Sequence, residues 1–244
     1  MRNSNATFIA ISNAVREHWI KKGLPSERIK RIYNIVKVDY RSNAIKNDSN
    51  TLKLLMVGSF VPGKGHVQII EALSKLPEDI KDKVSIDFVG ACGKTDRIRI
   101  EKCINKYGVN DNINFLGYQN NFGEHISGYD CGVMCSISEG LGRVTIEYML
   151  NGIPVIASNT GANPELIDDG VTGFFYKLND IDDLCKKVMR IYDKKNDGTL
   201  IEMGKMAREI SLAKFDEKKL VNEIFEVYDI ALNSYDYTTV KSKE

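Results

Sequence analysis

The sequence predicts an α/β fold built on a doubly wound parallel sheet. Six short apolar runs, rich in Val, Ile, Leu or Phe, recur along the chain at 52–58, 83–90, 112–117, 130–136, 153–158 and 172–176. Such runs, with little polar alternation, are typical of parallel strands that are buried on both faces. Helix-like stretches, among them 66–76 and 180–193, lie between them. The repeated β–α alternation indicates a six-stranded Rossmann-like domain, which we expect at 51–215.

The composition fits a folded protein without a specialised charge balance. The chain of 244 residues is 43% apolar and 27% charged, which predicts a packed core. With 34 basic and 33 acidic side chains, the net charge of +1 gives no electrostatic indication of nucleic-acid binding. No apolar run approaches the roughly 20 residues of a membrane span. The five cysteines and three histidines show no metal-ligand spacing, so we expect no metal site and a reducing, cytoplasmic setting.

The beginning of the chain is expected to be a separate β–α–β unit. TFIAIS and RIKRIYNIV are apolar runs on either side of the helix-like NAVREHWIKKG. A lone β–α–β unit cannot close a core of its own, so residues 1–40 are expected to be the end of a preceding domain. The polar stretch 41–50 predicts a linker.

The end of the chain is expected to be one amphipathic helix followed by a tail. In the helix predicted at 216–232, Leu220, Ile224, Tyr228 and Ala231 fall on one apolar stripe. Residues 233–244 are polar and predict a frayed tail.

A first glycine-rich stretch, GSFVPGKGH at 58–66, follows the first run of the sheet. It has the G-x-x-x-x-G-K spacing of a loop that binds nucleoside-triphosphate phosphates. However, Pro62 has no N–H group and Gly65 stands where that motif has Ser or Thr, although Asp87 ends a run that could hold a metal ion. The stretch is therefore an altered nucleoside-triphosphate site, a different diphosphate loop, or an ordinary strand-to-helix turn.

A second glycine-rich stretch, SEGLGRVTIEYMLNGIPVIAS, follows the fourth run and turns on Gly140 and Gly142. Such a turn exposes N–H groups at the positive end of a helix dipole, where phosphate or sugar oxygens bind. Glu139 lies in the turn and Glu147 in the following helix, and carboxylates accept hydrogen bonds from vicinal hydroxyls. The pair predicts recognition of two sugars of one ligand, against the alternative that both glutamates are surface charges.

A shorter stretch, GANPELIDDG at 161–170, predicts a small helix. Asn163 is expected to be its N-cap, with Pro164 at the first position, Glu165 in the first turn and Gly170 at the C-terminal cap. Ordinary capping chemistry accounts for Asn163 and Pro164, whereas Gly161 could also approach a bound ligand.

These segments together resemble a known family. EGLGRVTIE is similar to the E-x7-E signature of retaining glycosyltransferases with the GT-B fold, in particular family 4, the group 1 glycosyltransferases. GSFVPGKG resembles that family's G-R-x-x-x-x-K-G loop, and NINFLGYQNN, GYDCGVMCSISEG and NGIPVIASNTGANPELIDDGVTGFFY resemble later segments. FIAISNAVREHW and IKRIYNIV resemble the end of such an enzyme's N-terminal domain. The resemblance covers nearly the whole chain and implies the C-terminal half of a GT-B fold.

The resemblance implies roles for particular residues. Lys64 and Glu139 would be catalytic: the lysine would neutralise the donor's diphosphate, and the glutamate would bind donor-sugar hydroxyls. Glu147 would accept hydrogen bonds from the ribose, and the segment 116–119, where Tyr118 could stack, would flank the base. The implied donor-binding residues are Gly58, Ser59, Gly65, Gly90, Leu116, Tyr118, Gly140, Leu141, Gly142, Arg143, Val144 and Glu147.

The resemblance also implies the reaction. A UDP- or GDP-sugar would be the donor, with no metal or further cofactor, and the acceptor would be a glycan or a lipid-linked acceptor. GSFVPGKGH is then a diphosphate loop for a sugar nucleotide. A basic cluster at 21–31 could place the protein peripherally at the inner face of the membrane, against the favoured alternative that the cluster is a solvated surface.

Two departures from the family pattern stand out. Ser59 occupies a position where the family often has arginine, so one diphosphate contact is absent unless Arg143 replaces it. The chain also supplies only one of the two expected domains, so a missing N-terminal domain or a partner chain would hold the acceptor. We therefore expect the donor-binding half of a glycosyltransferase, with little transfer by this chain alone. The alternatives are a donor-binding module that needs a separate acceptor-domain chain, and a P-loop kinase or ATPase.

Overall fold

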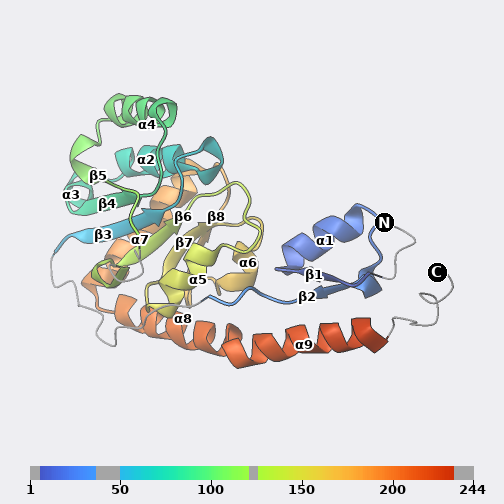
Figure 1. The fold of residues 1–244 in the computed structure, drawn as a ribbon. Coiled ribbons are helices and arrows are strands. Elements are labelled where there is room, and N and C mark those ends of the chain that lie inside the picture. Colours follow the sequence, from blue (N-terminus) through green and yellow to red (C-terminus); the bar gives the residue numbers. More distant parts are fainter. Residues whose placement is uncertain (1–5, 37–49, 121–125, 234–244) are drawn as a thin grey trace.

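The computed structural model describes residues 6–36, 50–120 and 126–233 (Figure 1). Its main feature is a six-stranded sheet in which every neighbouring pair of strands is parallel. The strands are β3 (Leu52–Val57), β4 (Val84–Val89), β5 (Ile113–Gly117), β6 (Cys131–Met134), β7 (Val155–Ser158) and β8 (Gly173–Tyr176). Each of the six apolar runs carries one strand, so the predicted fold class is confirmed.

The strand order creates a switch point in the middle of the sheet. The order is β5-β4-β3-β6-β7-β8, so the chain moves outward from β3 to β5 and then returns to the other side of β3. In doubly wound sheets, ligands bind at the carboxyl ends of the strands where this reversal occurs. Here the reversal lies between β3 and β6, and the two glycine-rich stretches follow these two strands.

Helices cover both faces of the sheet (Figure 1). Adjacent residues of β3 show the division: Leu54 belongs to a core with α2, α4 and α7, whereas Leu55 belongs to a core with α5, α8 and α9. Burial on both faces explains why the runs lack polar alternation. The helices are α1 (Asn13–Lys21), α2 (His66–Ser74), α3 (Glu78–Lys81), α4 (Lys94–Tyr107), α5 (Arg143–Leu150), α6 (Asn163–Leu166), α7 (Ile181–Asn196), α8 (Leu200–Lys214) and α9 (Glu217–Asn233).

Residues 6–36 form a smaller unit beside this domain (Figure 1). β1 (Phe8–Ala10) pairs in parallel with β2 (Ile29–Arg31), and α1 connects them. After β2, Ile32, Tyr33 and Val36 leave strand geometry and are buried in the core that also contains Leu55. The unit is therefore attached to the main domain by burial of apolar surface. The predicted linker and tail lie outside the described residues, except for Asn50 and Asn233.

The last helix, α9, runs from the main domain to this smaller unit (Figure 1). Leu220 and Val227 are buried, and Lys30 of β2 pairs with Glu226 at 2.8 Å. The predicted stripe was wrong at Tyr228, which is 56% exposed. Val227, three residues after Ile224, is buried in its place. Because Leu220 and Ile224 are four residues apart, a following step of three keeps the apolar side chains closer to the helical period of 3.6 residues.

Candidate functional site

The loops after β3 and β6 meet at the switch point, and we call residues 58–65 and 135–142 together the cradle. The backbone N–H of Ile137 donates to the carbonyl oxygen of Gly63 at 3.0 Å. The side-chain amide of Gln68 donates to the carbonyl oxygen of Cys135 at 3.0 Å. The cradle is thus held by hydrogen bonds between segments that are far apart in the sequence.

Gly65 is required where the two loops touch. Its φ of +75° lies in the left-handed region, and it ends a 3-10 turn (Pro62–Lys64) before α2 begins. A Cβ on Gly65 would lie 2.1 Å from the carbonyl oxygen of Cys135. Only glycine allows both the turn and this approach.

The loops after β3, β4 and β5 are joined at their first residues. Gly58 donates to the carbonyl oxygen of Val89 at 2.8 Å, and Gly90 donates to that of Gly117 at 2.9 Å. A Cβ on Gly90 would lie 2.0 Å from the carbonyl oxygen of Gly58, so the glycine permits this close approach. The structure therefore brings the predicted residues Gly58 and Gly90 together at the carboxyl edge.

The loop after β6 delivers Glu139 and then begins α5. Gly142 is the N-cap of α5 with φ of +70°, and no side chain in the described part of the chain caps the first turn of this helix. The N–H groups of Arg143 and Val144, which follow it, lie at the positive end of the helix dipole. The loop after β7 supports this turn, because Ala162 donates to the carbonyl oxygen of Glu139 at 3.0 Å.

The two predicted catalytic residues meet in the cradle. Lys64 Nζ lies 2.5 Å from Glu139 Oε1, and the side chains are 31% and 14% exposed. Partial burial makes this ion pair stronger than a solvated surface pair. It places a cation and a carboxylate side by side between β3 and β6.

Glu147 is set apart from this pair. It lies half-buried on α5, and burial raises the pKa of its carboxyl above the usual value, while the Arg143 charge acts in the opposite direction. Among the described residues, its carboxylate makes no hydrogen bond or ion pair. A desolvated carboxylate without a partner favours binding of a hydroxyl donor.

The predicted base-flanking residues lie at the edge of this region. Leu116, the last residue but one of β5, is exposed, and the Tyr118 side chain just after the strand is 71% exposed. Ser59 is also exposed. Ser59 belongs to the cradle itself. The segment with Leu116 and Tyr118 is linked to it by the hydrogen bond from Gly90 to Gly117 and by the packing of Phe115 against Phe60.

The geometry does not favour the P-loop alternative. Asp87 lies within β4 and not in a loop, and its carboxylate accepts from Asn114 at 2.8 Å and from Tyr129 at 2.7 Å. Its oxygens are therefore engaged within the sheet. The described residues contain no group of three or more His, Cys, Asp or Glu side chains placed to hold a metal ion.

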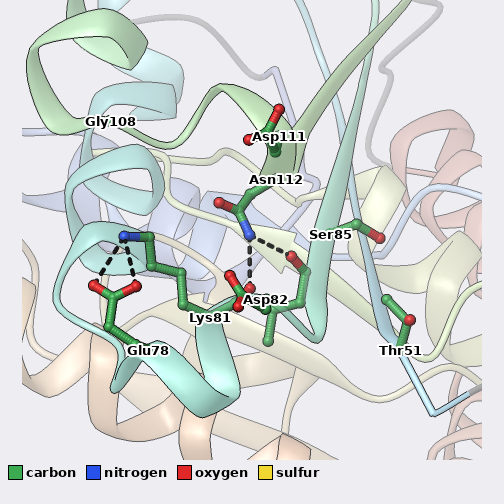
Figure 2. A pocket seen from close by; sticks show the side chains of 9 residues that line it. Thr51, Glu78, Lys81, Asp82, Ser85, Gly108, Asp111 and Asn112 are labelled. Atoms are coloured by element: carbon green, nitrogen blue, oxygen red, sulfur yellow. Dashed lines mark hydrogen bonds and ion pairs between the residues drawn. The ribbon is translucent and has the colours of Figure 1, made fainter.

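A second hollow lies at the opposite, amino edge of the sheet (Figure 2). It measures about 460 Å³ and is lined by Thr51, Glu78, Lys81, Asp82, Val84, Ser85, Gly108, Asp111 and Asn112. Figure 2 shows pairing within part of this lining: Lys81 reaches Glu78, and Asn112 donates to the carbonyl oxygens of Lys81 and Val84. The two glycine-rich loops lie at the carboxyl edge and not around this hollow, so we take the carboxyl edge as the candidate site.

The sequence did not single out Gln68, which supports the cradle, and predicted for Gly161 only an approach to the bound ligand. The Gln68 side chain connects the loop after β6 to β8: its amide nitrogen donates to the carbonyl oxygen of Cys135, and its amide oxygen accepts from the Tyr176 hydroxyl at 3.1 Å. Gly161 approaches Glu139 so closely that a Cβ would lie 2.6 Å from the Glu139 nitrogen. Gln68 could have been noticed in the sequence because it is a polar residue on the apolar face of the helix predicted at 66–76.

The short helix α6 differs from its prediction. Ala162, not Asn163, is at the N-cap position, and the helix ends before Ile167 rather than at Gly170. The Asn163 side chain is instead buried and donates to the carbonyl oxygen of Ser158 at 3.0 Å. Tertiary contact with β7 therefore replaces the local capping role.

The fold and the cradle define a Rossmann-like α/β domain in which two glycine-rich loops meet at the topological switch point. The chain belongs to the group 1 glycosyl transferases, because the family's model matches residues 39–210, well over half of the chain.

Named relatives agree with this membership. The chain is 25% identical over 230 residues to the N-acetyl-alpha-D-glucosaminyl L-malate synthase of Bacillus anthracis, covering 90% of this chain and 58% of that protein. It is 27% identical over 223 residues to the UDP-Gal:alpha-D-GlcNAc-diphosphoundecaprenol alpha-1,3-galactosyltransferase of Escherichia coli, covering 88% of this chain and 54% of that protein.

A solved structure has the same fold. Anabaena Alr3699/HepE in complex with UDP-glucose matches with a TM-score of 0.81 and 25% identity, over 93% of this chain and 64% of that chain. With the family match, this shows the C-terminal domain of a GT-B glycosyltransferase. The chain spans 54% to 64% of the length of these three proteins. Within the part of the chain that the structure describes, no helix combines the length and apolar character needed to cross a bilayer.

Proposed function

We propose that this chain is the donor-binding half of a retaining glycosyltransferase that moves a sugar from a UDP- or GDP-sugar to a glycan or lipid-linked acceptor. The observation that carries the proposal is the Lys64–Glu139 pair, 2.5 Å apart, between two glycine loops at the switch point. Two similar proteins support it: the Escherichia coli galactosyltransferase is named for a UDP-sugar donor, and the Anabaena protein was solved with UDP-glucose.

Lys64 and the start of α5 would hold the charged part of the donor. A diphosphate would replace Glu139 as the partner of Lys64 and accept from the first N–H groups of α5. Glu139, released from Lys64, would accept from the hydroxyls of the transferred sugar. The lysine charge would then stabilise the leaving diphosphate, so we propose that the reaction needs no metal ion.

The chemical step we propose is same-face displacement. The bond between the anomeric carbon and the diphosphate oxygen breaks, and the acceptor hydroxyl oxygen forms the new bond on the same face. The hydroxyl proton passes to an oxygen of the leaving diphosphate. This chain then needs no side-chain nucleophile, and its contribution is to position the donor and to neutralise charge.

Glu147 would bind the ribose, and Leu116 and Tyr118 would flank the base. The half-buried carboxylate of Glu147, which has no partner among the described residues, is suited to two vicinal hydroxyls. The exposed Tyr118 ring offers a stacking surface at the end of β5.

A second domain, on the same or another chain, would supply the acceptor wall. α9 carries an exposed apolar stripe at Phe225, Tyr228 and Leu232, and Trp19 of α1 is also exposed. Exposed apolar surface of this kind favours an interface. We place the protein in the cytoplasm at the inner face of the membrane, where its free cysteines stay reduced. The alternative of a donor-binding module with a separate acceptor chain shares this surface.

The experiment that tests the proposal is a thermal-shift panel with UDP, GDP, ADP and ATP, each with and without magnesium. The samples are the wild type, Glu147→Ala and, as control, Glu209→Ala, which removes an exposed carboxylate of α8. A ligand at a hundredfold its Kd adds about 2.7 kcal/mol of stability. UDP or GDP should stabilise the wild type and the control without magnesium, but not Glu147→Ala. Stabilisation by ATP with magnesium alone would overturn the proposal.

Lys64→Met is expected to weaken UDP binding by about tenfold to a hundredfold, because a charge-assisted hydrogen bond contributes about 1.5–3 kcal/mol. Isothermal titration calorimetry with UDP measures the Kd. Lys205→Met, which removes an exposed lysine of α8, is the control and should bind as the wild type does. Equal affinities of the two variants would contradict the role of Lys64.

The UDP affinity is expected to fall in acid partly through Glu147. The pKa of its carboxyl is raised by burial, and hydroxyl donors favour the charged form, so binding lowers this pKa. Affinity is then full above the raised pKa and falls as the pH drops through it. Titrations with UDP from pH 4.5 to 7.5 should show a steeper acid loss for the wild type than for Glu147→Gln. Parallel profiles would exclude Glu147 from the site, because the UDP phosphates titrate equally in both.

A further inference from the structure

Glu165 connects the smaller unit to the main domain through the first turn of α1. Its two carboxylate oxygens accept from the backbone N–H of Asn13 at 2.8 Å and of Ala14 at 2.7 Å. The Tyr33 hydroxyl donates to the same carboxylate at 3.2 Å. The Lys214 ammonium donates to the Glu165 main-chain oxygen. Four contacts from three segments thus converge on one residue of α6.

These contacts complete the capping of α1. The first N–H groups of a helix have no partner within the helix. The Ser12 hydroxyl accepts from Val15 at 3.1 Å and its carbonyl oxygen from Arg16 at 3.0 Å, whereas the N–H groups of Asn13 and Ala14 donate to Glu165. A carboxylate at the positive end of the helix dipole is favourable, and these are charge-assisted hydrogen bonds. The cap of α1 is therefore partly supplied by the other unit.

The same region touches the loop that carries Glu139. A Cβ placed on Gly140 would lie 3.5 Å from Ile11 Cδ1 and 3.8 Å from Val15 Cγ2, so the start of α1 lies against the Gly140 turn. On the other side, Ala162 donates to the Glu139 carbonyl oxygen just before α6 begins. α6 therefore contacts both the Glu139 loop and α1.

We propose that Glu165 is a positioning residue, which fixes the start of α1 against the Gly140 turn and so sets the shape of the donor cradle. The effect on the donor rests on the function proposed above, whereas the effect on α1 does not. Glu165 touches no reacting atom in this scheme; it acts through the backbone of α1 and through the loop that holds Glu139.

The test compares Glu165→Gln with Ser12→Ala. Glutamine keeps the shape but turns one acceptor into a donor that faces an N–H group. Ser12→Ala removes a cap from the same helix turn without removing any contact between the two units. Both variants should loosen α1 locally, but only Glu165→Gln should release it from the cradle. Should Glu165→Gln not fold, Glu165→Asp, which keeps the charge on a shorter side chain, is measured in the same way.

Two measurements on the whole chain decide the matter. NMR hydrogen exchange at Asn13 and Ala14 should accelerate about tenfold in Glu165→Gln, in line with the loss of a hydrogen bond to a charged group, and only at Val15 in Ser12→Ala. The nuclear Overhauser contacts between the Ile11 and Val15 methyls and Gly140 should vanish in Glu165→Gln alone. Intact methyl contacts or unchanged exchange in Glu165→Gln would overturn the positioning role.

A titration with UDP tests the link to the donor. The Kd for UDP should rise about threefold or more in Glu165→Gln and stay unchanged in Ser12→Ala. An equal Kd in both variants would overturn the claim that Glu165 shapes the cradle. Where the wild type itself binds no nucleoside diphosphate, the proposed function fails, and the methyl contacts still decide whether Glu165 positions α1.

Discussion

Gly65→Ala is expected to destabilise the protein by about 3 kcal/mol or more, since backbone strain at positive φ and an overpacked contact each cost about 1–3 kcal/mol. The new Cβ would lie 2.1 Å from the Cys135 carbonyl oxygen, which is backbone and cannot rotate away. Relief of the overlap would push the loop after β6 away from β3. The Lys64–Glu139 pair spans that contact, so UDP binding should be lost together with stability.

Gly63→Ala is the matched control in the same loop. A Cβ there would meet only the Ile137 side chain, at 3.7 Å and 3.8 Å, which is ordinary contact. Its stability should change by less than about 1 kcal/mol. Urea unfolding of both variants measures the difference. Similar midpoints for Gly63→Ala and Gly65→Ala would contradict the packing described for the cradle.

Lowering the pH from 6.5 to 4 is expected to remove about 3 kcal/mol of stability through His66 alone. Burial, helped by the charges of Arg99 and Lys64, lowers the pKa of His66 to about 4. The unfolded chain therefore binds a proton near pH 6.5 that the folded chain accepts only near pH 4. The stabilisation is present above pH 6.5 and is lost as the pH falls through this window.

The His66 ring makes packing contacts instead of hydrogen bonds. It stacks on Phe60 with ring centroids 4.5 Å apart, and neither ring nitrogen has a hydrogen-bond partner among the described residues. His66→Phe should therefore fold and should lack this part of the acid loss, whereas His18→Gln, at an exposed histidine of α1, should keep it. Unfolding free energies from pH 7.5 to 4 for the three proteins measure the effect. The same acid loss in His66→Phe as in the wild type would show that His66 does not cause it.

Much of the fold could be predicted because the burial of a strand is visible in a short stretch of sequence. Leu54 and Leu55 are adjacent, and both are buried, on opposite faces of β3. A short apolar run without polar alternation is typical of a parallel strand that lies between two layers of helices. The same reasoning was less reliable for assigning single residues to the buried face of a helix. In α9, Val227 is buried and the predicted Tyr228 is exposed.

The candidate site was predictable in its parts and not in its contacts. Glycines after strands indicated two ligand-binding loops, and the family resemblance gave roles to Lys64, Glu139 and Glu147. The role of Gln68 and the close approach of Gly161 to the Glu139 backbone were not predicted, because each depends on a loop that is distant in the sequence. Asn163 was predicted to be the N-cap of its helix, but its side chain donates to the carbonyl oxygen of Ser158 in β7.

The sequence by itself determined which segments become strands, where glycine turns follow them, and that the protein is a doubly wound α/β fold. These properties depend on side-chain period and on backbone freedom, which are local. Only the tertiary structure decided that β6 returns beside β3, which brings Lys64 to Glu139, and that Glu165 caps a helix of another unit. Strand order and contacts between units are set by the packing of the whole chain, because no local propensity specifies which strands become neighbours.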